Sequence, residues 1–449
     1  MSQKPSEEWW RPDRLDEGRY PLEGIVAAGA EGDSAFPFWS LMAFTFILLL
    51  APQAFFPVLA PLRIALLATA VAVTTYLMDR FIHQQPIVRF SREMWIIVCL
   101  VSWAVLTLPF SYWPGGSLSF LLDLYLKTVV IFWLLSHTVR TPARLRQVAW
   151  ALSLMSMYLA WHGVNQYLSG RFLAGATVKR IVGYEASLTG NPNDLALMLN
   201  LILPLSVALF LSARNIFVRI GLGSIVVWQA AAVIVTFSRA GFLTLATTFL
   251  IYSWKLRARP ERCWVMAALV LSLLGAPFLP AGYLDRVATI TDIESDSTGS
   301  AQARWNDTVA ATIFVLANPI VGAGLGMNIL ALNEARGAAW KEVHNVYLEY
   351  AVDLGFPGLF LFLALMVTCI ECTKFVQRRS AGVETRRELF CLAEGIQVSL
   401  IAFAIAALFY PVAYHFYFYY IAGLAVAAKA VCERASKRPA VEPNQLAAA

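Results

Sequence analysis

The chain has 449 residues, and its composition excludes a soluble globular protein. Hydrophobic residues make up 59% of the sequence and charged residues only 14%, and the mean hydropathy is +0.62. Soluble domains carry roughly 25% charged residues, so we expect an all-α, polytopic integral membrane protein. The six cysteines show neither zinc-ligand spacing nor a disulfide framework. Because no carboxylate cluster in the expected outer loops has metal-ligand spacing either, we expect no metal and no cofactor.

Hydrophobic runs long enough to cross a bilayer recur along the chain. A helical span needs about 20 apolar residues, and the sequence predicts twelve spans. They cover residues 38–56, 59–78, 94–110, 118–138, 144–168, 192–212, 217–236, 240–254, 262–280, 356–375, 389–409 and 414–432. Residues 1–37 and 433–449 are the expected terminal tails, and an even number of spans puts both on one side. The first 35 residues lack the apolar core of a signal peptide, so none is expected.

One long polar insertion, residues 281–355, separates the ninth and tenth spans. The segments on the side of the N-terminus hold 25 of the 35 lysines and arginines, whereas the opposite side holds eight. Lysine and arginine accumulate in cytoplasmic loops. We therefore expect both tails in the cytoplasm and residues 281–355 outside.

Three arginines are expected at the outer surface, although lysine and arginine usually accumulate on the cytoplasmic side. Arg239 lies in Ser238-Arg239-Ala240-Gly241, a barely polar joint between two spans. Arg180 follows Lys179 and precedes a turn and helix start that contain Asn193. Arg304 opens a segment with apolar residues at helical spacing, which predicts an amphipathic helix on the outer membrane interface; these residues are Trp305, Val309, Ile313 and Leu316.

The insertion ends with His344-Asn345-Val346-Tyr347-Leu348-Glu349, followed by Gly355 and Gly358. Histidine exchanges a proton near neutral pH, and the arginine fork matches phosphate oxygens. The sequence therefore predicts an anion site on the outer side with a base beside it. In the alternative, each arginine pairs with a lipid headgroup or with a carboxylate such as Asp194, Asp307 or Glu349.

Two further patterns have structural interpretations. Gly322, Gly324 and Gly326 are spaced like a nucleotide-binding loop, but no strand precedes them, so we predict a tight turn. Asp123 and Lys127 are four residues apart in one predicted span. We expect them to neutralise each other, an interpretation favoured over an ion pathway.

Several of these motifs, in this order, resemble the O-antigen ligase and polymerase superfamily over residues 170–432. They are Asn191-Pro192-Asn193 at a span start, Ser238-Arg239-Ala240-Gly241, Arg304-Trp305, Gly322-x-Gly324 and the His344 to Glu349 segment. The resemblance implies glycan transfer from an undecaprenyl diphosphate carrier to an acceptor hydroxyl at the periplasmic side of the bacterial inner membrane, without a metal. The closest likeness is to the ligase that joins O-antigen to lipid A-core. O-antigen polymerases and protein O-oligosaccharyltransferases share the signature and stay open as alternatives.

The resemblance and the residues imply the same roles for the site. Arg180, Arg239 and Arg304 are expected to stabilise the departing diphosphate, and His344 to take the acceptor proton as the catalytic base in an inverting transfer. Further substrate-binding residues are expected, with Glu349 orienting the imidazole; they are Lys179, Asn193, Asn345, Tyr347 and Glu349. The expected partners are the lipid-linked donor, the lipid A-core acceptor and membrane lipids, and no nucleic acid.

A transporter or lipid flippase is the rival from another functional class, since twelve spans is also a common transporter count. Many transporters show internal repeats with polar interruptions in matching spans. The large insertion after residue 280 has no counterpart in the first half of the chain. The sequence therefore favours an enzyme.

Overall fold

The computed structural model describes residues 34–174, 180–184, 186, 188–290, 299–336 and 340–437. Within these ranges the chain forms helices and no strand, apart from one isolated bridge between Phe172 and Ile181. The predicted all-α class is confirmed. The longer helices are α1 (Phe36–Leu50), α3 (Ile64–Ile82), α4 (Arg92–Thr107), α6 (Leu126–Thr138), α7 (Pro142–Leu168), α8 (Pro192–Ser212), α9 (Ile216–Val235), α10 (Arg239–Leu256), α11 (Arg262–Gly275), α13 (Ser300–Ala317), α14 (Asn328–Arg336), α15 (Val346–Ser380), α16 (Arg387–Ala406) and α17 (Phe416–Lys437).

Short helices connect the long ones. They are α2 (Pro52–Phe55), η1 (Pro57–Leu62), η2 (Leu108–Phe110), α5 (Pro114–Phe120), the π-helical turn η3 (Leu121–Tyr125), η4 (Ala276–Phe278), α12 (Tyr283–Ala288) and η5 (Glu384–Arg386). Among the described residues, eight helical stretches are long and apolar enough to cross a membrane, and two shorter ones, Phe36–Leu50 and Arg262–Phe278, are apolar. The chain is thus a polytopic membrane protein, and the count of twelve spans stays a prediction.

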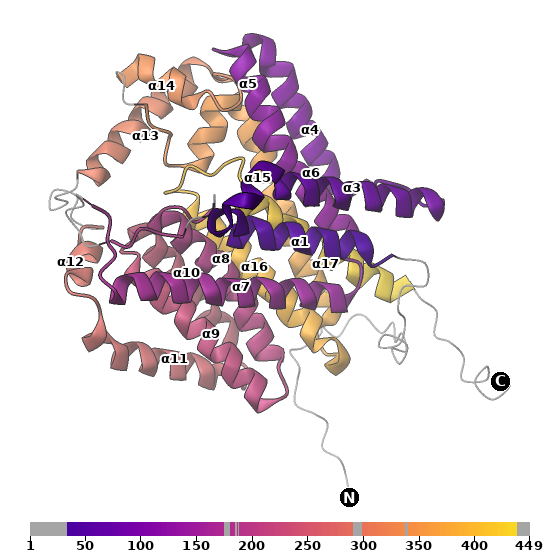
Figure 1. Ribbon diagram of the computed structural model, residues 1–449, viewed down its shortest axis with the longest axis vertical. Coiled ribbons are helices and arrows are strands. Elements are labelled where there is room, and N and C mark those ends of the chain that lie inside the picture. Colours follow the sequence, from indigo (N-terminus) through magenta and orange to yellow (C-terminus); the bar gives the residue numbers. More distant parts are fainter. Residues whose placement is uncertain are drawn as a thin grey trace, which may run out of the picture.

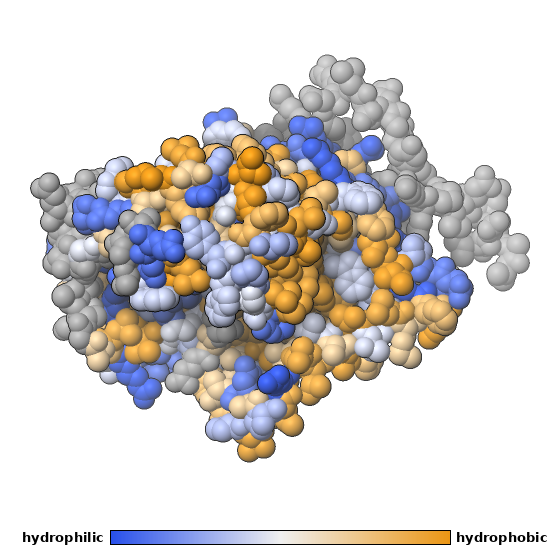
Figure 2. Space-filling view, turned by 90° about the horizontal axis from the view of Figure 1, so that it is seen from above, coloured by the Kyte–Doolittle hydropathy of each residue, from blue (hydrophilic) through white to orange (hydrophobic). Residues whose placement is uncertain are grey.

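Three helices occupy the centre of the bundle. Of the 18-residue apolar stretch in each helix, 83% is buried in α8, 83% in α16 and 78% in α17, compared with 22% in α3. Helix α8 packs against α9 and α16, and α15 packs against α4, α16 and α17 (Figure 1). On the face shown in Figure 2, hydrophobic residues dominate the middle and hydrophilic ones gather towards the left and right ends. An apolar exterior around an apolar core is what a bilayer requires of a helical protein.

The two described ends of the chain lie on one side. The backbone N–H of Ser34 donates to Asp79 at the end of α3, and Arg144 at the start of α7 donates to the Ser34 carbonyl. In Figure 1, the start of α1 and the end of α17 lie to the right, whereas α12, α13 and α14 lie at the left and upper left. The helices of the polar insertion therefore lie away from both ends.

Buried polar side chains join neighbouring helices in the bundle. Gln229 of α9 donates to Ser156 of α7 at 2.6 Å and to Ser206 of α8 at 3.1 Å. Towards the side of the described ends, Arg259 makes two 3.0 Å contacts with the buried carboxylate of Glu394 in α16. Side-chain hydrogen bonds hold helices together where lipid provides no hydrophobic drive between them.

A kink in α15 connects the polar insertion to the bundle. Gly355 has φ 67° and Pro357 has no N–H, so the carbonyls of Val352 and Asp353 lose their partners in the helix. The turn that contains the three glycines replaces them. Its backbone N–H groups donate from Ala323 to Val352 at 2.7 Å and from Gly324 to Asp353 at 2.9 Å.

The glycine turn also reaches the side chain of Asp353. The N–H of Gly326 donates to Asp353 Oδ2 at 3.0 Å, and φ is 72°, 100° and 72° at Gly322, Gly324 and Gly326. A Cβ at Gly322 would lie 2.5 Å from the Val352 carbonyl oxygen. Glycine is the residue that fits such a backbone and such an approach, so the predicted tight turn is confirmed.

Helix α13 is amphipathic, as the spacing of its apolar residues predicts. Phe314 and Val315 are buried against the glycine turn region, together with Ala311. The opposite face exposes a stripe of large apolar side chains, namely Trp305, Val309, Ile313 and Leu316. The helix is therefore built to lie between a protein surface and an apolar environment.

Replacing Gly322 by alanine should destabilise the fold more than the same change at Gly170. Both residues have φ 72°, but no described atom lies within 4 Å of a Cβ at Gly170. The left-handed backbone costs roughly 1–2 kcal/mol at either position, and the overlap at Gly322 adds about 1–3 kcal/mol. Thermal unfolding of the two variants in one detergent measures the difference, and equal Tm values would contradict the docking of the turn on the kink.

Candidate active site

Arg180 connects the loop after α7 to two other elements. Its Nη2 donates to Asn193 Oδ1 at 2.7 Å, and its Nε donates to the Thr236 carbonyl at 3.2 Å. Asn193 lies in the first turn of α8, and Thr236 follows α9. The half-buried guanidinium therefore has a fixed place, while Lys179 lies outside the described residues.

The loop that carries Arg180 is fixed at both of its ends. Gln166 of α7 donates to the Gly183 carbonyl at 2.7 Å and accepts from the N–H groups of Val182 and Gly183. On the other side, Asn191 accepts from the N–H groups of Asn193 and Asp194 and so caps α8. An Asn at the N-cap with Pro directly after it is a strong helix start, as the sequence predicts.

Each residue of the Ser238-Arg239-Ala240-Gly241 motif has a distinct position. Ser238 Oγ accepts from the Gly241 N–H at 3.1 Å and caps α10. A Cβ at Gly241 would lie 2.8 Å from Ala196, so glycine lets α10 approach α8 closely. Arg239 is half-buried, and its Nη1 donates to Thr289 Oγ1 at 2.9 Å, directly after α12.

Four arginines gather on this side of the molecule. Burial lowers the pKa of Arg180 to about 10, and the positive charges of Arg286, Arg304 and Arg239 lower it further. Hydrogen bonds connect the segments of three of them: Arg180 donates to Thr236, three residues before Arg239, and Arg239 donates to Thr289, whose hydroxyl donates to the Arg286 carbonyl. They come from the α7–α8 loop and from α12, α13 and α10, which lie towards the left of Figure 1.

His344 stands beside α13, directly before α15. Its Nδ1 lies 3.1 Å from the Glu342 carbonyl oxygen, which assigns the proton to Nδ1 and the lone pair to Nε2. Burial lowers the pKa of His344, and the charge of Arg304 lowers it further, whereas Asp307 raises it. The imidazole is therefore neutral near pH 7 and lies close to one of the four arginines.

The three residues after His344 make their hydrogen bonds inside the protein. Asn345 accepts from the N–H groups of Tyr347 and Leu348 and caps α15. The Tyr347 hydroxyl donates to the Ala404 carbonyl in α16 at 2.7 Å. The buried Glu349 carboxylate accepts from the N–H after α16, at Ala413, and makes no described hydrogen bond to the His344 imidazole. The substrate contacts expected for Asn345, Tyr347 and Glu349 stay a prediction.

The structure adds residues that sequence reasoning did not select. Arg286 is one of the eight cations expected on the outer side, and nothing in the sequence indicates that α12 places it near Arg180. Tyr410 follows α16, and its hydroxyl lies 3.4 Å from Ser238 Oγ. Burial raises the pKa of Tyr410 to about 12, while Arg304 and Arg180 oppose the rise. Tyr410 therefore borders the arginine cluster.

Comparisons with known proteins support a family. Residues 224–363 match a family model described as O-antigen ligase, and residues 25–210 match one described as a family of unknown function. No curated protein matches the sequence significantly. Among solved structures, a chain from "Structural coordination of polymerization and crosslinking by a peptidoglycan synthase complex" is similar, with 16% identity, a TM-score of 0.42, and coverage of 77% of this chain and 98% of that chain.

The O-antigen ligase match spans most of the site. It contains the Arg239 motif, Arg304, the glycine turn and His344, while Arg180 lies in the part matched by the second model. A membrane glycosyl-transfer activity of the ligase or polymerase kind is thereby supported. Together with the motifs and the helical membrane fold, this match over residues 224–363 supports the O-antigen ligase superfamily for the chain.

Proposed function

We propose that this protein transfers O-antigen polysaccharide from undecaprenyl diphosphate to a sugar hydroxyl of lipid A-core. The reaction takes place at the periplasmic side of the bacterial inner membrane. The observation that carries the proposal is the gathering of four arginines around one region, with a neutral histidine beside Arg304. A lipid-linked diphosphate and an acceptor hydroxyl are the two chemical groups that this pair of features fits.

The arginine cluster binds the diphosphate of the donor. Arg180 and Arg239 are held in advance by Asn193 and Thr289, so little reorganisation is needed when the anion arrives. Guanidinium groups make two-point contacts with phosphate oxygens. They also stabilise the negative charge that grows on the leaving group, and at a pKa of about 10 the Arg180 guanidinium stays charged at neutral pH. No metal is needed for this step.

His344 removes the acceptor proton. The acceptor oxygen attacks the anomeric carbon from the side opposite the diphosphate, and its proton passes to Nε2 of the imidazole. The bond between the anomeric carbon and the phosphate oxygen breaks, and its electron pair stays on the diphosphate. The configuration inverts, and the imidazolium then releases its proton to water.

The residues after His344 act by positioning it. Asn345 caps the helix that begins beside the base, and Tyr347 and Glu349 attach that helix to the end of α16. Asn193 positions Arg180 in the same way. Lys179, which precedes Arg180 in the sequence, remains a predicted substrate-binding residue.

A reconstituted reaction tests the proposal. Purified protein is incubated with undecaprenyl-diphosphate O-antigen and lipid A-core, with EDTA and without nucleotide or an ion gradient, and the lipids are separated by electrophoresis. O-antigen joined to lipid A-core is the expected product. Longer glycans on undecaprenyl diphosphate would indicate a polymerase instead, and glycosylated protein would indicate an oligosaccharyltransferase. No product under any of these conditions would contradict glycosyl transfer.

The topology in the proposal makes α13 periplasmic. In a background without the exposed Cys99 and Cys263, a cysteine at Asn306 should react with a membrane-impermeant maleimide added to intact cells with a permeabilised outer membrane. A cysteine at Gln84, between α3 and α4, should react only after the inner membrane is opened. The reverse pattern would place the arginine cluster in the cytoplasm and would remove the basis of the site.

Alanine at Arg180, Arg239, Arg286 or Arg304 should each lower the rate of transfer by about 10²–10³, the loss typical of one missing transition-state donor. Lysine should restore activity only in part, because a point charge lacks the planar fork. Arg171→Ala, at an exposed arginine of the same loop, is the matched control and should keep full activity. Unchanged rates in all four cluster variants would reject diphosphate binding here.

His344→Ala should lower the transfer rate by about 10²–10⁴ with nearly unchanged donor binding, since the arginines hold the diphosphate. Weak donor binding with normal turnover would instead make His344 a phosphate ligand. The candidate base would then be Glu349 or His415, which directly precedes α17.

The pH dependence of transfer should follow the charges around His344. The base works when neutral, so the rate should fall as the pH drops through its lowered pKa. Lys341→Gln removes a charge that lowers this pKa, so the acid limb should move to higher pH. Asp307→Asn removes a charge that raises it, and the limb should move to lower pH. Initial rates between pH 4 and 8 measure both shifts, and a profile that neither variant moves would contradict the assignment of the base.

A further inference from the structure

A second candidate site is a cavity formed mainly by the N-terminal helices. A cavity of about 380 Å³ lies between α1, α2, η1, α3, α6 and α17. Its wall is mostly apolar, with Phe44, Leu48, Leu59, Ile131 and Phe416 among the lining side chains. One water needs about 10–15 Å³ of such space, so the cavity has room for a sizeable ligand.

The cavity is open to the lipid-facing surface. Leu66, which lines it, is 50% exposed, and its neighbours Leu62 and Leu67 are 53% and 54% exposed. Helix α3, which forms one wall, is among the least buried helices of the bundle. A ligand can therefore enter from the bilayer without crossing the protein.

Two cations line this apolar cavity. They are Arg63, at the N-cap of α3, and Lys127 in α6. The first turn of α3, through Ile64 and Ala65, lines it as well, and the N–H groups of a helix start carry positive partial charge. Asp123 lies 3.5 Å from Lys127, which confirms the expected pair, but its side chain is 79% exposed and does not line the cavity. Asp123 thus partly neutralises Lys127 from outside the cavity, and the charged side chains that line the cavity are both cationic.

The same wall carries two unusual polar and backbone features. Gln53 lines the cavity, and within the described part of the chain its buried Oε1 has no hydrogen-bond partner. A π-helical turn, Leu121–Tyr125, precedes Lys127 and contains Asp123. Such turns are rare and occur frequently at functional sites. The Gln53 oxygen accepts hydrogen bonds, so a ligand group that donates one, such as a headgroup hydroxyl, would satisfy it.

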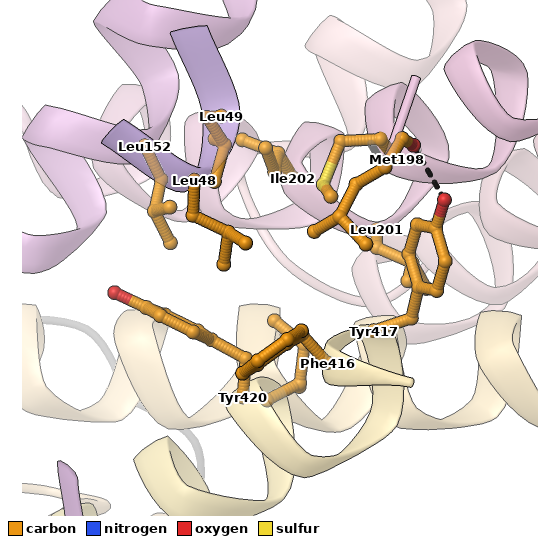
Figure 3. Close-up of a pocket in the computed structure, with 11 residues that line it drawn as sticks. Leu48, Leu49, Leu152, Met198, Leu201, Ile202, Phe416, Tyr417 and Tyr420 are labelled. Atoms are coloured by element: carbon orange, nitrogen blue, oxygen red, sulfur yellow. Dashed lines mark hydrogen bonds between the residues drawn. The ribbon is translucent and has the colours of Figure 1, made fainter. Parts of the chain in front are cut away.

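A neighbouring cavity provides a contrast. It measures about 20 Å³, shares Leu48 and Phe416 with the larger one, and is lined without charged side chains. Figure 3 shows leucine, isoleucine and methionine side chains on one side, facing Phe416 and Tyr420. The Tyr417 hydroxyl, also drawn there, donates to the Leu188 carbonyl. This small space is a packing void. Of the two cavities, the larger one has Arg63 and Lys127 in its lining.

We propose that the cavity between α1, α3 and α6 binds an anionic membrane phospholipid. The lipid phosphate lies between Arg63 and Lys127, and its hydrocarbon chains lie along the apolar wall that includes Leu59, Ile131 and Phe416. A phosphodiester supplies the negative charge that the two cations and the start of α3 favour. The fit of an apolar wall with a cationic rim argues for a lipid rather than a free anion. The site is independent of glycosyl transfer.

Native mass spectrometry of the detergent-purified full chain tests this site. Phosphatidylglycerol should be retained, and phosphatidylethanolamine should bind at least about tenfold more weakly. Arg63→Gln combined with Lys127→Gln should lower phosphatidylglycerol retention by about tenfold or more. Ala65→Phe, which fills the cavity without changing its charge, should do the same.

Matched controls separate this cavity from the rest of the surface. Arg92→Gln removes a cation whose side chain is 70% exposed and paired with Glu371, and Ala268→Phe adds the same bulk on the exposed face of α11. Both should retain phosphatidylglycerol. Unchanged retention after both cavity changes would overturn the proposal. So would preferential retention of a prenyl diphosphate, or displacement of the lipid by inorganic phosphate alone.

Discussion

The arrangement of the polar insertion depends on two backbone carbonyl groups at the kink of α15, which need hydrogen-bond donors from outside the helix. Val352 and Asp353 lose their helical donors because Gly355 turns the chain and Pro357 has no N–H. Val352 and Asp353 are fully buried, and a buried backbone group without a partner costs about 1–3 kcal/mol. The glycine turn supplies the missing N–H groups and so attaches α13 and α14 to the bundle. The position of Arg304 follows from this attachment, since α13 carries it.

The positive charges of the arginine cluster repel one another in the free protein. Four guanidinium groups lie near one another and partly away from water, and burial together with mutual repulsion lowers the pKa of Arg180. Hydrogen bonds to Asn193 and Thr289 hold two of them in place despite that repulsion. In the proposed reaction a diphosphate relieves this repulsion, so the cluster would favour a doubly charged ligand over a neutral one. The chemistry of the leaving group and the structure of the free site are therefore complementary.

Local patterns in the sequence predict much of this fold, because they depend on neighbours along the chain. Apolar runs predict the helices, Asn191 with Pro192 predicts the start of α8, and the glycine spacing predicts the turn. The segment from His344 predicts an accessible base, and Asn345 as an N-cap belongs to the same local rules. These features need no knowledge of tertiary packing.

Other features depend on which helices meet in space. Tyr347 and Glu349 follow His344 closely, yet helical geometry turns them towards α16 and the segment after it. Arg286 resembles any other outward cation until α12 is placed beside α10. Proximity of this kind comes from packing between segments more than 100 residues apart, such as Arg180 and Arg286, and one sequence contains no direct record of it.

Two helices, α13 and the one that begins after His344, determine the surroundings of the imidazole. The helix after His344 is bound to the bundle through the Val346 N–H, the Tyr347 hydroxyl and the Glu349 carboxylate. Helix α13 instead turns a stripe of apolar side chains outward. The opposite face of α13 is buried against the glycine turn and α15, so that helix is held as well. It carries both Arg304, which lowers the pKa of His344, and Asp307, which raises it, so the basicity of the imidazole depends on the position of this one helix.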